Sequence, residues 1–408
     1  EQHEQKASVS MKLSDRANAI HGSATVELNA RVLALKKSGV DIIKFNIGEP
    51  DFNTPENICD AGKRAMDEGK TRYTAVPGTA ELREQISKKL REDNGLSYAV
   101  NEICVTTGAK QAIFETMMAL VQAGDEVIIP TPCWVSYESM VKIAGAEPVF
   151  VPTKQTDDLF NLDIPAIAAA VTSKTRAIII NTPNNPTGVV YPKETLLELL
   201  ELAAKHDFMI VADEIYEKLI YNGQKHFSIA SVSEEAKAHV VTINGFSKSY
   251  AMTGWRLGYL AGPQELVKAV QRLQGHITSA ACSISQAAAL EALAGPQDSV
   301  VKMKAAFDEN RVTMFKLCSQ IPHVTCREPD GAFYLMPDVS WYYGKSADGT
   351  QVKNSADLAN YLLEKAHVAV VPGDSFRAPD CIRLSYSNSL KNIERGMEQM
   401  RQALAELK

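Results

Sequence analysis

The chain has 408 residues, more than one hydrophobic core usually supports, so we expect two domains. Its 45% hydrophobic and 23% charged residues are typical of a globular protein, and its net charge of −6 argues against nucleic acid or an anionic membrane as the main partner. No apolar run approaches the roughly 20 residues that a membrane-spanning helix needs.

Cysteine and histidine usage narrows the class further. The seven cysteines are scattered, odd in number and never spaced as Cys-x-x-Cys, so we expect free thiols in a reducing compartment and predict a cytoplasmic protein. The eight histidines show no metal-ligand spacing, so we expect no structural metal. Residues 1–10 are polar and do not form a secretory signal, and we interpret them as a processed leader or a remnant of expression.

Taken in chain order, the first elements are a helical pattern at 24–37 and a strand-like run at 42–47. Helices and strands then alternate, starting at Pro55, which suits a first helical turn. We expect helices at 56–68, 79–93, 110–122, 136–145, 193–206 and 264–274, and strands at 103–106, 126–129, 148–151, 176–181, 208–212, 240–244 and 257–261. This alternation predicts an α/β fold, in which residues 55–295 form a large domain with a mostly parallel seven-stranded sheet between helices.

The pattern changes after Pro296. We expect helices at 299–319, 355–366 and 389–407, and strands at 324–326, 332–336, 368–371 and 381–385. This mixture predicts a smaller α+β domain of residues 296–408, to which residues 11–54 return.

A lysine and an arginine eight residues apart form the most informative pair. Lys248 follows the apolar run 239–244, and Arg256 stands between Gly254 and Gly258. Because a buried lysine amine loses its proton readily, Lys248 suits condensation with an aldehyde, and the guanidinium fork of Arg256 suits a phosphate. Taken alone, a surface turn followed by a structural arginine is an equal alternative.

Further polar residues follow other predicted strands, where open α/β sheets bind ligands. Asp213 follows one strand and can hold a protonated ring nitrogen, while Tyr216 can donate to a ring oxygen. Gly108 begins a strand-to-helix turn that suits a phosphate, and Arg383 in an apolar strand needs an anionic partner. The alternatives are a capping Asp, a core Tyr, an ordinary turn and an internal salt bridge.

The stretch 247–259, Ser-Lys-Ser-Tyr-Ala-Met-Thr-Gly-Trp-Arg-Leu-Gly-Tyr, resembles the pyridoxal-phosphate signature of class I aminotransferases. Residues 181–188 and 213–216 resemble two further signatures of that family, in the same order. The resemblance runs from about Met11 to the C-terminus and is closest to the bacterial-type aspartate and aspartate/prephenate aminotransferases. It implies fold type I, the cofactor pyridoxal 5′-phosphate, and a homodimer with shared active sites.

The resemblance also implies the role of each candidate residue. The catalytic residues are Lys248, which carries the cofactor, Asp213 at the ring nitrogen and Tyr216 at the ring's phenolic oxygen. Asn185 binds the same oxygen, and Trp134 stacks on the ring. The phosphate site comprises Gly108, Ala109, Lys110, Ser247, Arg256 and, across a dimer interface, Tyr73. One position departs from some members of the family, because Gly245 replaces a serine that contacts the phosphate.

For the substrate, the resemblance assigns the α-carboxylate to Arg383 and Gly48, and a side-chain carboxylate to Lys110 and Thr25, with Trp134 and Asn185 also lining the site. The expected reaction is transamination between aspartate or glutamate and a 2-oxo acid, with prephenate as an added substrate. A β-lyase or racemase on the same scaffold and a non-catalytic ligand-sensing module are the alternatives. For Lys110, the alternative role is to offset the phosphate charge.

Overall fold

The computed structural model describes residues 11–22 and 24–408, so the interpretation of residues 1–10 lies outside the described residues. Its largest sheet has the strand order β2-β8-β7-β6-β5-β3-β4. In chain order these strands are β2 (Ile103–Thr106), β3 (Glu126–Thr131), β4 (Glu147–Pro152), β5 (Thr175–Asn181), β6 (Met209–Asp213), β7 (Val240–Gly245) and β8 (Gly258–Ala261). Strand β8 runs antiparallel to β2 and β7, and the other pairs are parallel. The predicted mostly parallel seven-stranded sheet is confirmed.

The direction of β8 follows from a short connection. Parallel neighbours need a crossover that is usually helical, whereas residues 246–257 contain only the 3₁₀ turn η3 (Thr253–Trp255). The chain therefore reverses between β7 and β8. This reversing loop carries both Lys248 and Arg256, so the two side chains start from the same end of the sheet.

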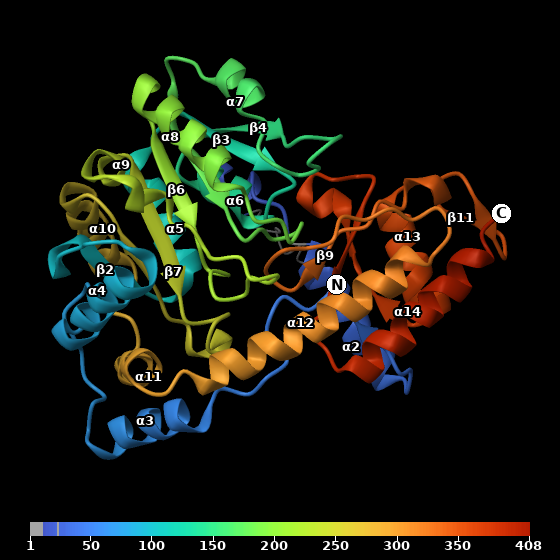
Figure 1. The fold of residues 1–408 in the computed structure, drawn as a ribbon, viewed down its shortest axis with the longest axis horizontal. Helices are drawn as coiled ribbons and strands as arrows, with labels where there is room; N and C mark the ends of the chain where they lie inside the picture. Colours follow the sequence, from blue (N-terminus) through green and yellow to red (C-terminus); the bar gives the residue numbers. More distant parts are fainter. Residues whose placement is uncertain (1–10, 23) are drawn as a thin grey trace, which may run out of the picture.

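Alternate residues of the central strands enter two different hydrophobic cores, which is why these strands read as continuous apolar runs. Ile178 and Ile180 pack in one core with helices α4 (Ala80–Asn94) and α8 (Lys193–His206). Ile179 packs in the other with α5 (Gly108–Leu120), α6 (Ser136–Ile143) and α10 (Gln264–Ile277). Figure 1 shows helices on both sides of the sheet.

The chain segment that carries the seven-stranded sheet also contains three helices that we did not predict: α7 (Ile164–Ala170), α9 (Glu234–Ala238) and α11 (Ser283–Ala294). Helix α11 packs against both α3 (Glu56–Asp67) and α4. Its alanine-rich sequence therefore has apolar neighbours on two sides and no amphipathic stripe that could have revealed it.

The long helix α12 (Asp298–Ser319) leads from this sheet to the C-terminal elements, as Figure 1 shows in orange. These are η4 (Ser340–Tyr342), α13 (Ser355–Tyr361), the π-helical turn η5 (Leu362–Ala366), η6 (Gly373–Phe376) and α14 (Leu390–Ala405), with the short strands β9 (Tyr334–Leu335), β10 (Ser346–Ala347), β11 (Thr350–Gln351), β12 (Val368–Ala369), β13 (Val371–Pro372) and β14 (Ile382–Ser385). Most of them share a third hydrophobic core with Ile43 and Phe45, whereas Val371 of β13 and Phe376 of η6 belong to the first core.

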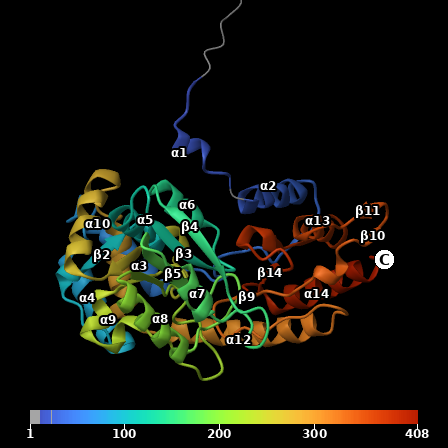
Figure 2. The same ribbon diagram turned by 90° about the horizontal axis from the view of Figure 1, so that it is seen from above.

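The N-terminal residues run back to these elements. Strand β1 (Ile43–Lys44) pairs in parallel with β12, and Arg31 of α2 (Ala24–Lys37) forms an ion pair with Glu364 at 3.1 Å. The short helix α1 (Asp15–Asn18) buries no residue and stands away from the body in Figure 2. The predicted domain boundaries stay a prediction.

Several predicted boundaries are wrong in the C-terminal part and in the N-terminal strand that pairs with it. Residues 324–326 form no strand, and only Thr325 makes an isolated bridge, to Asp338. The strands predicted at 42–47 and 332–336 shrink to two residues each, and the helix predicted at 355–366 changes to π-helical geometry at Leu362. These apolar residues are buried without regular pairing, and periodicity alone does not separate that state from a strand.

Candidate active site

A pocket of about 410 Å³ lies at the carboxyl ends of β5, β6 and β7. It is also lined by residues from α2, from the loop after β1, and from β14. All the predicted site residues line this pocket except Gly108 and Tyr73. Those that line it are Thr25, Gly48, Ala109, Lys110, Trp134, Asn185, Asp213, Tyr216, Ser247, Lys248, Arg256 and Arg383. Gly108 lies beside the pocket residue Arg256, and Tyr73 lines a second cavity.

Lys248 projects into the pocket from the loop after β7. Its Nζ donates to the backbone oxygen of Gly48, which ties the loop after β1 to the reactive amine. Burial, followed by the charge of Arg383, lowers the pKa of Lys248 to about 8. A substantial fraction of the amine is therefore neutral near that pH, as a nucleophile or proton acceptor requires.

Asp213 is the last residue of β6 and is only 4% exposed. Tyr137 donates to its Oδ2 at 2.5 Å, and the backbone N–H of Ile215 to its Oδ1 at 3.3 Å. Burial raises the pKa of Asp213 to about 6, against the opposing effect of the Tyr137 hydrogen bond. The carboxylate is thus ionised at neutral pH and, among the described residues, has no ion-pair partner of its own.

An anion seat forms where α5 begins. Gly108 has φ +81°, and a Cβ there would lie 2.7 Å from Nη2 of Arg256, so only glycine lets the guanidinium come this close. Arg256 donates from Nη1 to the backbone oxygen of Thr253 at 2.9 Å, which aims the fork at the helix start. The backbone N–H groups of the first turn of α5, the helix dipole and Arg256 therefore form a site that suits an anion. Ser247 also lines the pocket.

The serine that the resemblance suggests at position 245 would not fit here without a shift of its neighbours. A Cβ at this position would lie 3.1 Å from Cα of Gly258, from Cδ1 of Ile215 and from the backbone oxygen of Leu257. The close approach of β7 and β8 leaves no room for a side chain unless these neighbours shift. The phosphate seat of this chain therefore has to rely on the other residues.

Arg383 on β14 is 4% exposed and faces the pocket. Its Nη1 donates to Oδ1 of Asn185 at 3.0 Å and its Nη2 to the backbone oxygen of Asn46 at 3.3 Å, while Nε has no partner. The predicted alternative of an internal salt bridge is wrong, because no described carboxylate pairs with this guanidinium. A buried cation without a counter-charge is a site for an anion.

Aromatic and amide groups fix the remaining walls. The hydroxyls of Tyr216 and Tyr334 lie 2.7 Å apart, and burial, with Tyr334, raises the pKa of Tyr216, so it keeps its proton. Asn181 accepts from the backbone N–H of Asn185 at 2.7 Å and donates to the backbone oxygen of Asp213 at 2.9 Å. This amide therefore sets the spacing of two predicted site residues.

The residues expected at a side-chain carboxylate lie on separate elements. Nζ of Lys110, on α5, is 4.9 Å from the centroid of the Trp134 ring, and burial, with Arg256, lowers the pKa of Lys110. Thr25 reaches the pocket from α2, where Asn29, one turn later, also lines it. Both roles considered for Lys110 remain open in this geometry.

Tyr73 does not reach the pocket of its own chain. Its side chain is 96% exposed, and it lines a second cavity formed with residues of α3 and α11. A large aromatic side chain held so far into solvent makes no contact that would stabilise its own fold.

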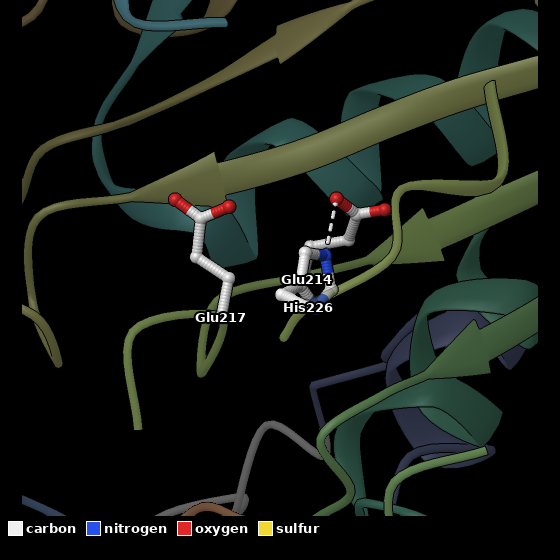
Figure 3. Close-up of side chains that lie close together, drawn as sticks. All are labelled: Glu214, Glu217 and His226. Atoms are coloured by element: carbon white, nitrogen blue, oxygen red, sulfur yellow. Dashed lines mark hydrogen bonds and ion pairs between the residues drawn. The ribbon is translucent and has the colours of Figure 1, made fainter. Parts of the chain in front are cut away.

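A second cluster of titratable residues, drawn in Figure 3, lies outside the pocket. His226 bonds to Glu214 at 2.8 Å, and Glu217 is close by, with potential ligand atoms within 4.8 Å of one another. However, Lys89 already contacts Glu217, and the charge of Glu214 and its hydrogen bond raise the pKa of His226 against the effect of burial. Two carboxylates that face a lysine and a histidine form a buried polar network, so we interpret this cluster as structural.

Sequence reasoning missed six pocket residues that hold or flank the predicted ones: Glu49, Tyr137, Asn181, Thr253, Tyr334 and Phe376. Asn181 and Thr253 lie inside recognised motifs, so their position was a usable signal. Tyr334 lies in an apolar run and Phe376 in a polar turn between Ser375 and Arg377, so neither gave a signal. Their place in the pocket depends on how β9 and η6 pack.

The comparisons with known proteins agree with this site. The family model for aminotransferases of class I and II matches residues 40–400, so the chain belongs to this family and is an aminotransferase. The chain is 45% identical to a protein of Petunia hybrida named bifunctional aspartate aminotransferase and glutamate/aspartate-prephenate aminotransferase, with 99% of this chain and 85% of that protein covered.

Two solved structures share the fold over nearly the whole chain. The aspartate aminotransferase of Rhizobium meliloti matches with a TM-score of 0.94 and 39% identity, covering 98% of this chain and 100% of that one. The aspartate aminotransferase of Thermus thermophilus with maleate matches with a TM-score of 0.91 and 41% identity, covering 97% and 100%. The resemblance and the fold type I architecture expected from the motifs are confirmed.

Members of this family use pyridoxal 5′-phosphate, and the residues of the pocket fit it. The glycine cradle beside Arg256 suits a phosphate, the buried carboxylate of Asp213 suits a ring cation, and Lys248 suits an aldehyde. Among residues 11–22 and 24–408, no helix is both long and apolar enough to cross a bilayer.

Proposed function

We propose that this chain exchanges the amino group of aspartate or glutamate with a 2-oxo acid, and that prephenate is a further acceptor. The observation that carries the proposal is the buried guanidinium of Arg383, which faces the pocket without a carboxylate of its own. The second lysine of the pocket, Lys110, supports a substrate with two carboxylates. The names of the Petunia, Rhizobium and Thermus relatives support the same substrate class.

Pyridoxal phosphate, when bound, supplies an electron sink for the bond that breaks at the substrate α-carbon. We assign the other steps to the residues of the chain. Arg256, Ser247 and the α5 N-terminus would hold the phosphate, and Trp134 would pack on the ring. Lys248 would hold the cofactor through its amine, and as the free amine its Nζ would accept the proton of the substrate α-carbon. Asp213 would stabilise a positive charge on the ring nitrogen, with Tyr137 fixing the orientation of the carboxylate.

At the substrate, Arg383 and Gly48 bind the α-carboxylate, and Asn185 orients the guanidinium through the 3.0 Å hydrogen bond. Asn185 keeps its Nδ2 donor available for the ring oxygen, since it uses only its carbonyl oxygen on Arg383. Tyr216 would donate to the same oxygen while it accepts from Tyr334. Lys110 and Thr25 bind the second carboxylate. An unpaired buried carboxylate costs several kcal/mol, so this second cation decides between dicarboxylic and neutral substrates.

Replacing Lys110 tests the substrate assignment. In Lys110→Ser, kcat/KM for aspartate should fall about 10²-fold, the effect of one lost charge-assisted contact of roughly 3 kcal/mol. Activity toward an uncharged amino acid such as alanine should change far less. Steady-state kinetics with both amino acids measure the difference, and an equal loss on both would mean that Lys110 serves the phosphate instead.

The reaction class has its own test. Purified protein loaded with cofactor should convert 2-oxoglutarate to glutamate in the presence of aspartate. Release of ammonia or pyruvate without amino-group exchange would favour the β-lyase alternative, and loss of optical activity would favour the racemase.

We further propose a homodimer with shared active sites, because the exposed ring of Tyr73 is unused by its own chain. If Tyr73 donates to the phosphate of the partner's site, Tyr73→Phe should weaken cofactor binding by roughly 1–2 kcal/mol without changing stability. Equilibrium dialysis of the cofactor and analytical sedimentation measure both parts. A fully active monomer would contradict the shared site.

Two smaller proposals complete the assignment. All seven cysteines are free thiols, which supports a reducing, cytoplasmic location. The pairing of β1 with β12 supports a small domain made of residues 11–54 and 296–408, with residues 55–295 forming the large one.

A further inference from the structure

Arg377 has a backbone conformation that is unfavourable for its residue type. It follows η6 on the way to β14 and has φ +59°, in the left-handed region that favours glycine. A non-glycine residue stays in this region when its surroundings compensate, and such positions cluster at functional sites. The contacts of the Arg377 side chain therefore indicate why an arginine stands there.

This side chain spans from η6 to the large sheet. Its Nη2 lies 3.0 and 3.1 Å from the two carboxylate oxygens of Glu138 on α6, and its Cζ lies 3.6 Å from the ring centroid of Phe150 on β4. Burial alone would raise the pKa of Glu138, but hydrogen bonds from Lys142 and Arg377 lower it, so the carboxylate is ionised at neutral pH. We call the contact between Arg377 and Glu138 the rim bridge.

The two segments that the rim bridge joins both contribute residues to the active-site pocket. Phe376, next to Arg377, lines the pocket, and its ring centroid is 4.9 Å from Cζ of Arg383. Its backbone oxygen accepts from the backbone N–H of Cys133 at 3.1 Å, next to the pocket residue Trp134. The same two segments, 373–378 and 132–138, are thus joined twice, once through the backbone and once through the rim bridge.

We propose that Arg377 is a positioning residue for substrate binding. The rim bridge fixes the separation between Phe376 and Trp134, and hence between the carboxylate site at Arg383 and the ring site. This inference rests on the proposed aminotransferase function. Without the bridge, the two walls keep the Cys133–Phe376 backbone hydrogen bond and their apolar packing but lose their ion pair, and substrate binding has to bear more of the cost of ordering them.

The test uses Arg377→Gly in the full-length, cofactor-loaded protein, because glycine suits the left-handed backbone and the variant should fold. We expect KM for aspartate and the dissociation constant of maleate to rise about threefold to tenfold, in keeping with one partly exposed ion pair and one cation–π contact. We expect kcat to change less than about twofold, and the visible absorbance and Tm to stay the same. Arg377→Lys, which keeps the charge but not the two-oxygen contact, should lie between.

Glu138→Gln removes the ion pair but not the contact of Arg377 with Phe150, so it should give part of the effect, and adding it to Arg377→Gly should cause no further loss. Arg395→Gln is the matched control, because the side chain of Arg395 is as exposed as that of Arg377, pairs with Asp41 at 2.7 Å and does not line the pocket. Wild-type values of KM and maleate affinity in Arg377→Gly, or independent effects of the two substitutions, would overturn the inference. An inactive wild-type protein would instead refute the proposed function.

Discussion

Replacing Lys248 with alanine should lower kcat by about 10⁴-fold, because one side chain serves both as the covalent anchor and as the group that moves the proton. Its position at the pocket, held by the backbone oxygen of Gly48, and its pKa of about 8 support both roles. Borohydride treatment of the loaded wild-type protein, followed by peptide mass spectrometry, should place the cofactor on the peptide that contains Lys248.

Two controls separate these roles of Lys248. Lys248→Arg keeps the positive charge but not the nucleophilic amine, so it should be as inactive as the alanine variant. A small primary amine such as ethylamine should restore part of the proton transfer in Lys248→Ala but not in Lys248→Arg, whose side chain fills the space. A borohydride-stable adduct that persists in Lys248→Ala would remove Lys248 from the mechanism.

Replacing Asp213 with asparagine should lower kcat/KM by about 10³-fold while making the cofactor-free protein more stable. The loss of activity follows because a neutral amide no longer holds a positive charge on the ring nitrogen. Asparagine has the same shape as aspartate, and the Tyr137 hydroxyl can reorient toward it, so the pocket should keep its geometry.

The gain in stability comes from removing a buried charge that has no partner when the cofactor is absent. Burial raises the pKa of Asp213 in the folded protein to about 6, from an ordinary value of 3.8. The ionised group therefore destabilises the folded state without cofactor; the penalty is absent below pH 3.8, grows between pH 3.8 and 6, and is complete above pH 6. Removing it should raise the free energy of unfolding by about 3 kcal/mol at pH 8 and by much less at pH 4.

Urea denaturation of the two cofactor-free proteins at these pH values measures this difference. Cofactor affinity should respond in the reverse direction, weakening in the wild type as the pH falls below about 6 and Asp213 takes up a proton. Equal stability of the two proteins at pH 8, or unchanged activity of Asp213→Asn, would show that this carboxylate does not face a ring cation.

Much of this protein was determined by its sequence alone. The alternation of apolar strands and amphipathic helices predicted the seven-stranded sheet, because that periodicity is a local property of the chain. Lys248, Asp213 and Arg256 were found for a similar reason, since each lies in a short motif where an apolar strand meets a polar turn. The resemblance then supplied roles that no spacing could supply.

Other features were decided only by the tertiary structure, because they depend on contacts between residues far apart in the chain. Tyr334 was predicted only as part of a strand and Phe376 was assigned no role, and the packing of β9 and η6 places both around Arg383. The left-handed backbone of Arg377 likewise left no local signal. Arg383 shows the division most clearly: the sequence indicated a buried charge in need of a partner, and the packing of β14 against the pocket showed that the chain itself provides no carboxylate for it.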